Sequence, residues 1–271
     1  MSAGEPTPTA RVPGGQAAIL ATVAARLAAA RRVTVLTGAG VSAASGVPTF
    51  RGPGGLWRHH RPESLATPEA FARDPRLVWE WYDWRRQVIA ACRPNRAHDV
   101  LAAWSRERPG VTVITQNVDG LHEHAGLEAV IRLHGSIWEV GCARRCHAAP
   151  RRWRDDTVPL PVLPPACPHC GGLLRPGVVW FGEELPAEAI SAAVAATACD
   201  VFITAGTSAV VYPAAGLVEE ARERGAWIAE VDPNETAASS RVDAALRLPA
   251  DVAFDELAAL LVTGLSACTN G

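Results

Sequence analysis

The chain contains no lysine. All 26 basic residues among its 271 are arginine, and 28 acidic residues bring the formal net charge to −2. A general nucleic-acid or membrane-surface binder carries a basic surplus, so this balance argues against both classes, although a local basic patch is still allowed. Compositional drift in a chain rich in alanine, arginine and proline accounts for the missing lysine. Every cationic contact to a phosphate or carboxylate must therefore come from arginine, a terminus or a helix dipole.

The chain also lacks a long apolar run. Its longest apolar stretches contain charges or end too early to span a bilayer, and its first residues resemble no signal peptide. We therefore expect a cytoplasmic protein without a membrane span. Residues 1–14 are expected to form a disordered tail, and 266–271 a short C-terminal tail. Hydrophobic residues make up 48% of the chain, which is typical of a globular protein.

Cysteine is sparse and unevenly placed. Four of the seven cysteines form two close pairs, Cys142 with Cys146 and Cys167 with Cys170. An odd total with such close pairs indicates a reduced compartment and a metal site. Four thiolates complete a tetrahedral shell and leave no open position, so we predict structural zinc. The first pair is one residue wider than usual, and His147 or His169 is an alternative to Cys146 as the ligand.

Short apolar segments alternate with helical ones along much of the chain. Strands are predicted at 33–37, 111–115, 129–133, 201–205 and 226–231, and helices at 16–31, 186–197, 213–224 and 254–261. This alternation predicts an α/β fold, a Rossmann-like doubly wound parallel sheet. We assign residues 15–50, 98–137 and 178–265 to that domain. A helical module at 51–97 and a zinc-ribbon module at 138–177 are predicted to form a smaller domain.

Loops that follow the predicted strands carry candidate ligand-binding residues. Gly38 and Gly40 precede a predicted helix start, an arrangement that lets backbone approach a pyrophosphate, although a structural turn has the same sequence. The third glycine of the usual fingerprint is Ala43, and no acidic residue follows about twenty positions later, so an ordinary NAD dehydrogenase is disfavoured.

Other strands are followed by polar loops. The residues of these loops are Gln116, Asn117 and Asp119 after one strand, His134 after the next, then Gly206, Thr207 and Ser208, and finally Asp232. They suit ribose hydroxyls, a carboxamide or phosphate, and His134 suits a general base. Solvated loops and a structural histidine are the alternatives, and His59, His60, His122 and His124 compete for the role of base.

Together these motifs resemble the sirtuins, which are NAD-dependent protein-lysine deacylases. The resemblance spans residues 16–263 and rests on GAGVSAASGVPTFRG (38–52), TQNVDGLHEHAG (115–126), LHGS (133–136), RPGVVWFGE (175–183), AGTSAVVYPAA (205–215) and the two cysteine pairs. It implies that NAD, a co-substrate, and an acyl-lysine peptide meet in a cleft between the two domains.

The resemblance also implies residue roles. NAD would be surrounded by Gly38, Ala39, Gly40, Ser42, Pro48, Phe50, Arg51, Trp57, Gln116, Asn117, Asp119, Gly206, Thr207, Ser208, Asp232 and Ala250. Peptide backbone would pair with residues 178–183, including Val179, Trp180, Phe181, Gly182 and Glu183. The acyl oxygen would attack C1′ of the nicotinamide ribose, and His134 would then accept a ribose hydroxyl proton. The products would be lysine, nicotinamide and 2′-O-acyl-ADP-ribose.

A helical segment rich in tryptophan refines the expected substrate. Tyr82 and Arg85 are three residues apart and share a helix face, where a phenol and a guanidinium can bind one carboxylate. This pair, with Ala66 as the small pocket residue, resembles the class III sirtuins and implies succinyl- or malonyl-lysine, with weaker activity on acetyl-lysine. The alternative is a tryptophan-rich core helix with a surface arginine.

Two departures and several other functions stay open. The family commonly has asparagine at the position of Asp232, and the wider first cysteine pair leaves its second ligand undecided. Protein mono-ADP-ribosylation and non-catalytic sensing of NAD or ADP-ribose are alternative functions. A zinc-ribbon nucleic-acid binder is a further one, because five arginines lie near the cysteines: Arg144, Arg145, Arg151, Arg152 and Arg154. We expect a monomer that does not bind nucleic acid.

Overall fold

The computed structural model describes residues 14–49 and 62–268. Helix α1 begins at Gly14 and α9 ends at Cys268, so each helix extends into a segment that was expected to be a tail. No helix in these two described segments is long and apolar enough to cross a membrane.

Six parallel strands form the main sheet. In chain order they are β1 (Val33–Thr37), β2 (Val111–Thr115), β3 (Val130–Arg132), β7 (Val201–Ala205), β8 (Trp227–Val231) and β9 (Ala244–Leu246). The spatial order is β3-β2-β1-β7-β8-β9, and every neighbouring pair is parallel. The chain therefore reverses its direction of travel across the sheet between β1 and β7, where α/β sheets bind ligands. Strand β9 is not predicted from the sequence, because three residues carry too short a pattern.

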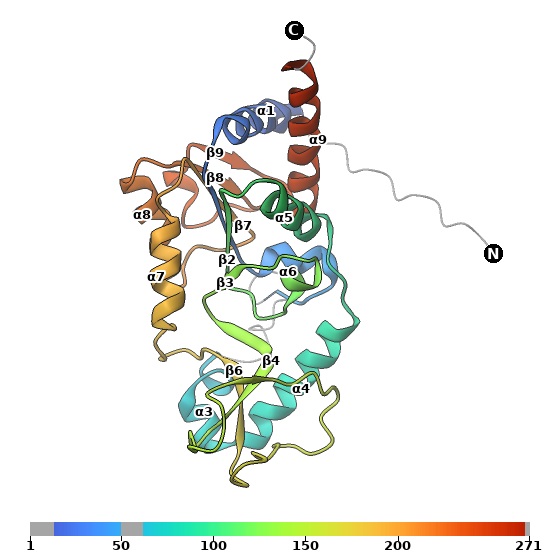
Figure 1. The fold of residues 1–271 in the computed structure, drawn as a ribbon, viewed down its shortest axis with the longest axis vertical. Coiled ribbons are helices and arrows are strands. Elements are labelled where there is room, and N and C mark those ends of the chain that lie inside the picture. The colour runs from blue at the N-terminus through green and yellow to red at the C-terminus, as the bar shows by residue number, and fades with distance from the viewer. Residues whose placement is uncertain (1–13, 50–61, 269–271) are drawn as a thin grey trace, which may run out of the picture.

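Helices cover both faces of this sheet (Figure 1). One face packs against α1 (Gly14–Ala29), α5 (Arg96–Glu107) and α9 (Ala250–Cys268), and the other against α7 (Ala187–Ala196) and α8 (Gly216–Glu223). The strands are apolar on both sides because both sides are buried, and β1 and β7 are buried at every residue. The predicted doubly wound α/β fold is confirmed.

The segment after β1 differs from its prediction. Residues Ala39–Ser45 form a 3-10 helix, η1, and not the start of an α-helix. The physical reason is close packing: the backbone nitrogen of Gly40 donates to the carbonyl of Gly206, 2.8 Å away, at the end of the neighbouring strand. The tight turn at the centre of the sheet is thus shaped by the adjacent loop.

A smaller domain lies beyond the carboxyl edge of the sheet (Figure 1). It consists of α2 (Pro62–Leu65), α3 (Pro68–Arg73) and α4 (Pro75–Ala91) with the antiparallel strands β4 (Gly135–Cys142), β5 (Trp153–Arg154) and β6 (Leu174–Val178). The side chains of Thr67 and Asp74 accept hydrogen bonds from the first turns of α3 and α4.

The helical and zinc modules of the small domain share one hydrophobic core. Buried side chains of α4, β4 and β6 pack together with Cys142 and Cys167. Arg86 of α4 is fully buried, and its Nε donates to the carbonyl of Ile137 at 2.8 Å. Two segments that are separate in the sequence therefore form one lobe.

Candidate functional site

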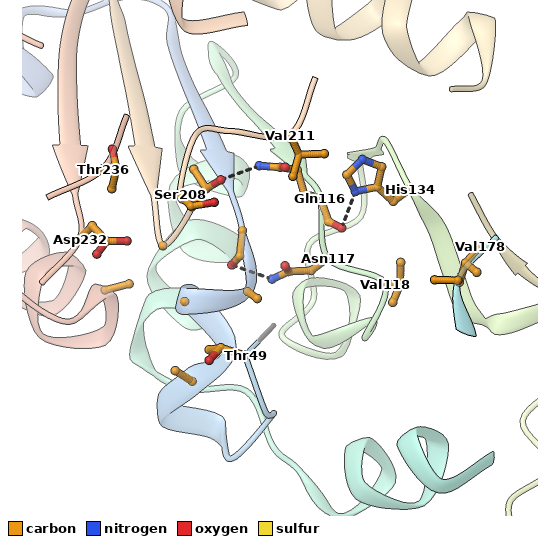
Figure 2. A pocket seen from close by; sticks show the side chains of 18 of the residues that line it. Thr49, Gln116, Asn117, Val118, His134, Val178, Ser208, Val211, Asp232 and Thr236 are labelled. Atoms are coloured by element: carbon orange, nitrogen blue, oxygen red, sulfur yellow. Dashed lines mark hydrogen bonds between the residues drawn. The ribbon is translucent and has the colours of Figure 1, made fainter. Parts of the chain in front are cut away.

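A cavity of about 1020 Å³ lies between the sheet edge and the small domain. It is lined by ten of the residues predicted to contact NAD: Gly38, Ala39, Gly40, Gln116, Asn117, Gly206, Thr207, Ser208, Asp232 and Ala250. Figure 2 shows Ser208 and Asp232 on one side of it and Gln116 and His134 on the other. The motifs that the sequence scatters over some 200 residues thus meet around one cavity.

The remaining NAD candidates have other positions. Ser42 and Asp119 are buried behind the cavity wall, with 0% and 5% of their surfaces exposed, and Pro48 is half-buried beside the lining residue Thr49. Phe50, Arg51 and Trp57 lie outside the described residues. Ser42 and Asp119 thus lie next to the cavity without lining it, and whether they contact NAD stays a prediction.

The glycines after β1 and β7 pack against each other. A Cβ added to Gly40 would lie 2.6 Å from the Cα of Gly206, and one added to Gly206 would lie 2.4 Å from the Val41 nitrogen. Gly206 also has a φ of +58°, which favours glycine. These glycines are required for loop-to-loop packing before any ligand approaches, and this reason is absent from the sequence pattern.

A buried hydrogen-bond network supports the Asn117 loop. Ser42 donates from its Oγ to Oδ2 of Asp119 at 2.8 Å, and Oδ1 of Asp119 accepts from the Leu121 backbone at 2.9 Å. The amide of Asn117 donates to the Gly38 carbonyl at 3.0 Å and to Oγ of Ser42 at 3.2 Å. Because each partner is buried, the network fixes the direction in which Asn117 faces the cavity.

Two histidines lie beside this network: His98, which was not singled out from the sequence, and His122, which was named there only as a competing base. Nε2 of His98 lies 3.4 Å from Oγ of Ser42, and its Nδ1 accepts from the backbone of Asn95 in a capping box. The rings of His98 and His122 are 4.9 Å apart. Burial lowers the pKa of both, that of His122 to about 3 with help from His98, so burial favours the neutral form of each ring. The N-R-A-H spacing at 95–98 marks a helix start and could have indicated the capping role.

Among the histidines that the structure describes, His134 is the one that lines the cavity. Its Nδ1 lies 3.0 Å from the backbone carbonyl of Gln116, an acceptor, so Nδ1 carries the proton and Nε2 holds a free lone pair (Figure 2). Burial lowers its pKa, and the Gln116 carbonyl partly opposes that shift. The competing His122 is fully buried and His124 is exposed, whereas His59 and His60 lie outside the described residues.

A buried carboxylate supports the loop after β8, on the sheet side of the cavity. Glu230, at 1% exposure, accepts from Oγ of Ser239 at 2.6 Å and from Arg247 at 2.5 Å, and it also binds the Thr236 hydroxyl. These contacts hold the loop that begins at Asp232. Burial raises the pKa of Asp232, whose Oδ1 accepts from the Asn234 backbone at 2.9 Å.

The opposite end of the cavity is built from α4. Tyr82 and Arg85 both line the cavity and are 2% and 6% exposed, so Arg85 is not the surface residue of the alternative interpretation. Burial raises the pKa of Tyr82 to about 12, and burial lowers that of Arg85, while Tyr82 and Asp119 oppose the second shift. The Arg85 guanidinium lies 4.9 Å from the Trp81 ring centre.

The segment that follows β6 passes this end of the cavity. The backbone nitrogen of Val179 donates to the His134 carbonyl and that of Phe181 to the Ala66 carbonyl, each at 2.9 Å. Val179, Trp180, Phe181, Gly182 and Glu183 all line the cavity, as does Ala66. Backbone hydrogen bonds therefore join the predicted peptide-binding segment to His134 on one side and to Ala66 on the other.

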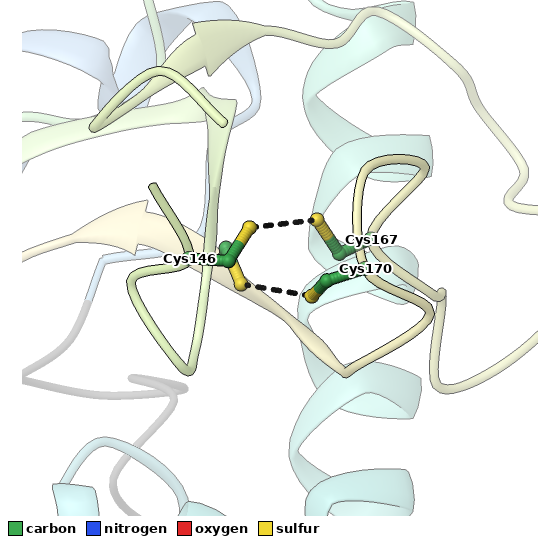
Figure 3. A group of neighbouring side chains, drawn as sticks. Cys146, Cys167 and Cys170 are labelled. Carbon is green, nitrogen blue, oxygen red and sulfur yellow. Dashed lines mark hydrogen bonds between the residues drawn. The ribbon is translucent and has the colours of Figure 1, made fainter. Parts of the chain in front are cut away.

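The four paired cysteines form a cluster in the small domain (Figure 3). Their sulfur atoms all lie within 4.8 Å of one another, with 3.6 Å between Cys142 and Cys170 and 3.9 Å between Cys146 and Cys167. Four thiolates around tetrahedral zinc stand roughly 3.8 Å apart, so this donor set fits structural zinc.

The structure identifies Cys146 as the fourth member of this cluster. Arg145 has a φ of 49°, and its nitrogen donates to the Cys142 carbonyl, so a tight turn accommodates the extra residue. His147 is exposed, and the His169 ring packs edge-on against Trp153. Of the neighbouring arginines, Arg154 pairs with Asp156 at 2.7 Å, and Arg152 donates to the Gly177 carbonyl at 2.8 Å.

The parallel sheet has a cavity at its switch point, and the small domain carries a four-cysteine cluster that fits zinc. Together these features are typical of a nucleotide-binding enzyme with a structural zinc site. The sequence profile of the Sir2 family matches residues 38–213. A protein of Aquifex aeolicus named NAD-dependent protein deacylase is 56% identical over 205 residues, which cover 75% of this chain and 84% of the relative.

Solved structures agree with this match. A Sir2 homologue in complex with NAD has a TM-score of 0.84 and 45% identity, with 90% of this chain and 94% of that chain covered. A second homologue, bound to a myristoylated histone peptide, has a TM-score of 0.75 and 29% identity, with 93% and 99% covered.

The chain belongs to the Sir2 family, the sirtuins. It is an NAD-dependent protein deacylase, and its four clustered cysteines form the structural zinc site. Tyr82 and Arg85, the pair that resembles the class III sirtuins, both lie in the wall of the cavity.

Proposed function

We propose that this deacylase removes succinyl and malonyl groups from protein lysines in preference to acetyl groups. The observation that carries the proposal is the burial of Tyr82 and Arg85 in the wall of the cavity that His134 also lines. A guanidinium in a cavity wall can bind an anion such as a carboxylate with two parallel hydrogen bonds. An acyl chain ending in a carboxylate supplies that anion, whereas an acetyl group does not.

NAD would occupy the sheet side of the cavity, where the loops after β1, β2, β7 and β8 converge. Gln116 and Asn117 would orient the ribose, and Asp119 would act on the carboxamide end through its contacts with Ser42 and Leu121. Ser208, Asp232 and Ala250 would contact the adenosine half. Bound NAD supplies the ribose carbon that becomes joined to the acyl oxygen as nicotinamide leaves.

His134 would act as the general base. The bond from Nδ1 to the Gln116 carbonyl leaves Nε2 free to accept a proton, and the lowered pKa keeps the ring neutral at physiological pH. The Gln116 side chain donates to Oγ1 of Thr207 at 2.9 Å, so the residue that orients the base is itself held by the opposite loop. The proton accepted would come from a ribose hydroxyl.

The acyl-lysine peptide would enter along residues 178–183. The Sir2 homologue solved with a myristoylated histone peptide supports an acylated peptide as the substrate class. Backbone pairing with this segment would give affinity with little selectivity for the sequence around the lysine. Selection would then fall on the acyl chain, in the space between Ala66, Tyr82 and Arg85.

The test is a product analysis over a panel of acyl peptides. Purified protein with NAD and succinyl, malonyl or acetyl peptide of one sequence should release nicotinamide and 2′-O-acyl-ADP-ribose, with the highest kcat/KM on the acidic acyl groups. Mass spectrometry of all products separates the alternatives, because an ADP-ribosyltransferase would modify the protein and a sensor would yield no product. A preference for the acetyl peptide would contradict the proposed specificity.

A further inference from the structure

A side-chain hydrogen bond joins the peptide-binding segment to the acyl end of the cavity. The indole Nε1 of Trp180 lies 3.0 Å from the hydroxyl oxygen of Tyr82. Trp180 is 3% exposed and Tyr82 2%, and both line the cavity. An indole nitrogen can only donate, so the phenol oxygen is the acceptor. The proton of the Tyr82 hydroxyl is then directed away from Trp180 and is available to another acceptor.

The orientation of the Trp180 ring is fixed on several sides. The Arg175 guanidinium lies 3.8 Å from its ring centre, and the Phe71 ring centre is 5.2 Å away. Arg175 in turn donates two bonds to the Glu183 carboxylate, at 2.6 and 2.8 Å, and that carboxylate accepts from the Trp180 backbone at 2.9 Å. A donor held this firmly can hold the group that it binds.

We propose that Trp180 is a positioning residue for acyl-group selection: its indole N–H fixes the Tyr82 oxygen as an acceptor, so that the Tyr82 hydroxyl proton points to the carboxylate of the acyl chain. This inference rests on the proposed function, because it needs a substrate carboxylate. Burial raises the pKa of Tyr82 to about 12, and its hydroxyl therefore keeps the proton that it donates. A carboxylate, which only accepts, suits this polarity.

The arrangement also means that the donor for acyl recognition is oriented before the peptide enters. Trp180 belongs to the segment that would pair with the peptide backbone, whereas Tyr82 belongs to α4. Since Arg175 and Phe71 hold the Trp180 ring, a peptide seated on residues 178–183 would meet an acyl pocket whose hydrogen-bond donor is already oriented.

The experiment is a double-mutant cycle on the ratio of kcat/KM for succinyl peptide to kcat/KM for acetyl peptide. Trp180→Phe keeps an aromatic ring and removes the N–H, and Tyr82→Phe removes the hydroxyl. We expect Trp180→Phe to lower the ratio about three- to tenfold in the native background, chiefly through a higher KM for the succinyl peptide. In the Tyr82→Phe background the same change should leave the ratio as it is, because the acceptor is gone. The ratio cancels general effects on NAD and peptide binding.

A matched control is Trp227→Phe, since Trp227 is half-buried in β8 and lies outside the cavity lining. It should leave the ratio unchanged. If Trp180→Phe lowers the ratio equally in both backgrounds, or in neither, the positioning role is wrong. If Tyr82→Phe itself leaves the ratio unchanged, the proposed acyl specificity fails as well, so the two failures are distinguishable.

Discussion

The two ends of the cavity are built in different ways. The sheet end consists of backbone and short polar side chains on loops after parallel strands, held by contacts such as Gly40 on Gly206. The small-domain end consists of buried aromatic and arginine side chains from α4 and the segment after β6. The first arrangement suits a ligand common to all turnovers, and the second suits discrimination among substrates. Variants at the sheet end should therefore affect every acyl group alike, and variants at the small-domain end should change their ratio.

The largest effect is expected at His134, which would act on the NAD ribose whichever acyl group is bound. His134→Ala removes the proposed general base, so kcat should fall roughly 10²- to 10⁴-fold for succinyl and acetyl peptides equally. Nicotinamide release and 2′-O-acyl-ADP-ribose formation measure this loss. Thermal unfolding serves as the control and should change little. Full activity in the variant would remove His134 from the mechanism.

The small-domain end also depends on the zinc lobe, because Cys142 and Cys167 belong to the core that includes Tyr82. Cys146→Ala should release zinc, lower Tm by many degrees and abolish peptide-dependent turnover. His147→Ala is the matched control, since His147 is exposed and next to the same turn. Zinc content and Tm report the result. Retention of a full zinc equivalent by Cys146→Ala would show that another group is the fourth ligand.

The pH profile tests the environment of His134. Burial lowers its pKa, so the neutral, proton-accepting form persists below the ordinary histidine value of about 6.5. We expect the acid limb of the kcat/KM profile to be centred below pH 6.5, with the same profile for both acyl groups. An acid limb centred above pH 6.5 would mean that another group controls the rate.

The smallest effect is expected at the far side of the sheet end. Asp232→Asn keeps an oxygen that can accept from the Asn234 backbone and removes a half-buried carboxyl whose pKa is raised. KM for NAD should change by no more than about threefold, because single neutral contacts contribute little. The succinyl-to-acetyl ratio should not move. A change in that ratio would contradict the assignment of NAD binding to the sheet end and acyl selection to the small-domain end.

The sequence predicted the residues at the sheet end of the cavity better than the packing contacts that hold them. Strand-loop motifs located Gly38, Asn117, His134 and Gly206, since residues after parallel strands must meet at one edge. It did not reveal that the glycines pack against one another or that His98 lies behind Ser42, because these contacts depend on close packing between distant segments. The three-residue spacing of Tyr82 and Arg85 predicted a shared face, but only the fold shows that this face is buried.

The boundaries were predicted less well than the elements. Strands β1, β2 and β7 match their predicted ranges, whereas η1 replaces an expected α-helix because the Gly206 loop constrains it. The bond from Trp180 to Tyr82 joins residues 98 positions apart, and no local pattern could have indicated it.

The measurement that tests the central claim most directly is the succinyl-to-acetyl ratio of kcat/KM for the native enzyme and for Arg85→Met. Methionine fills much of the space of arginine but cannot bind a carboxylate. The native enzyme should favour the succinyl peptide, and the variant should lose that preference by roughly ten- to a hundredfold, as expected for a buried charge-assisted contact. An equal fall for both peptides would contradict the assignment of this end of the cavity to acyl selection.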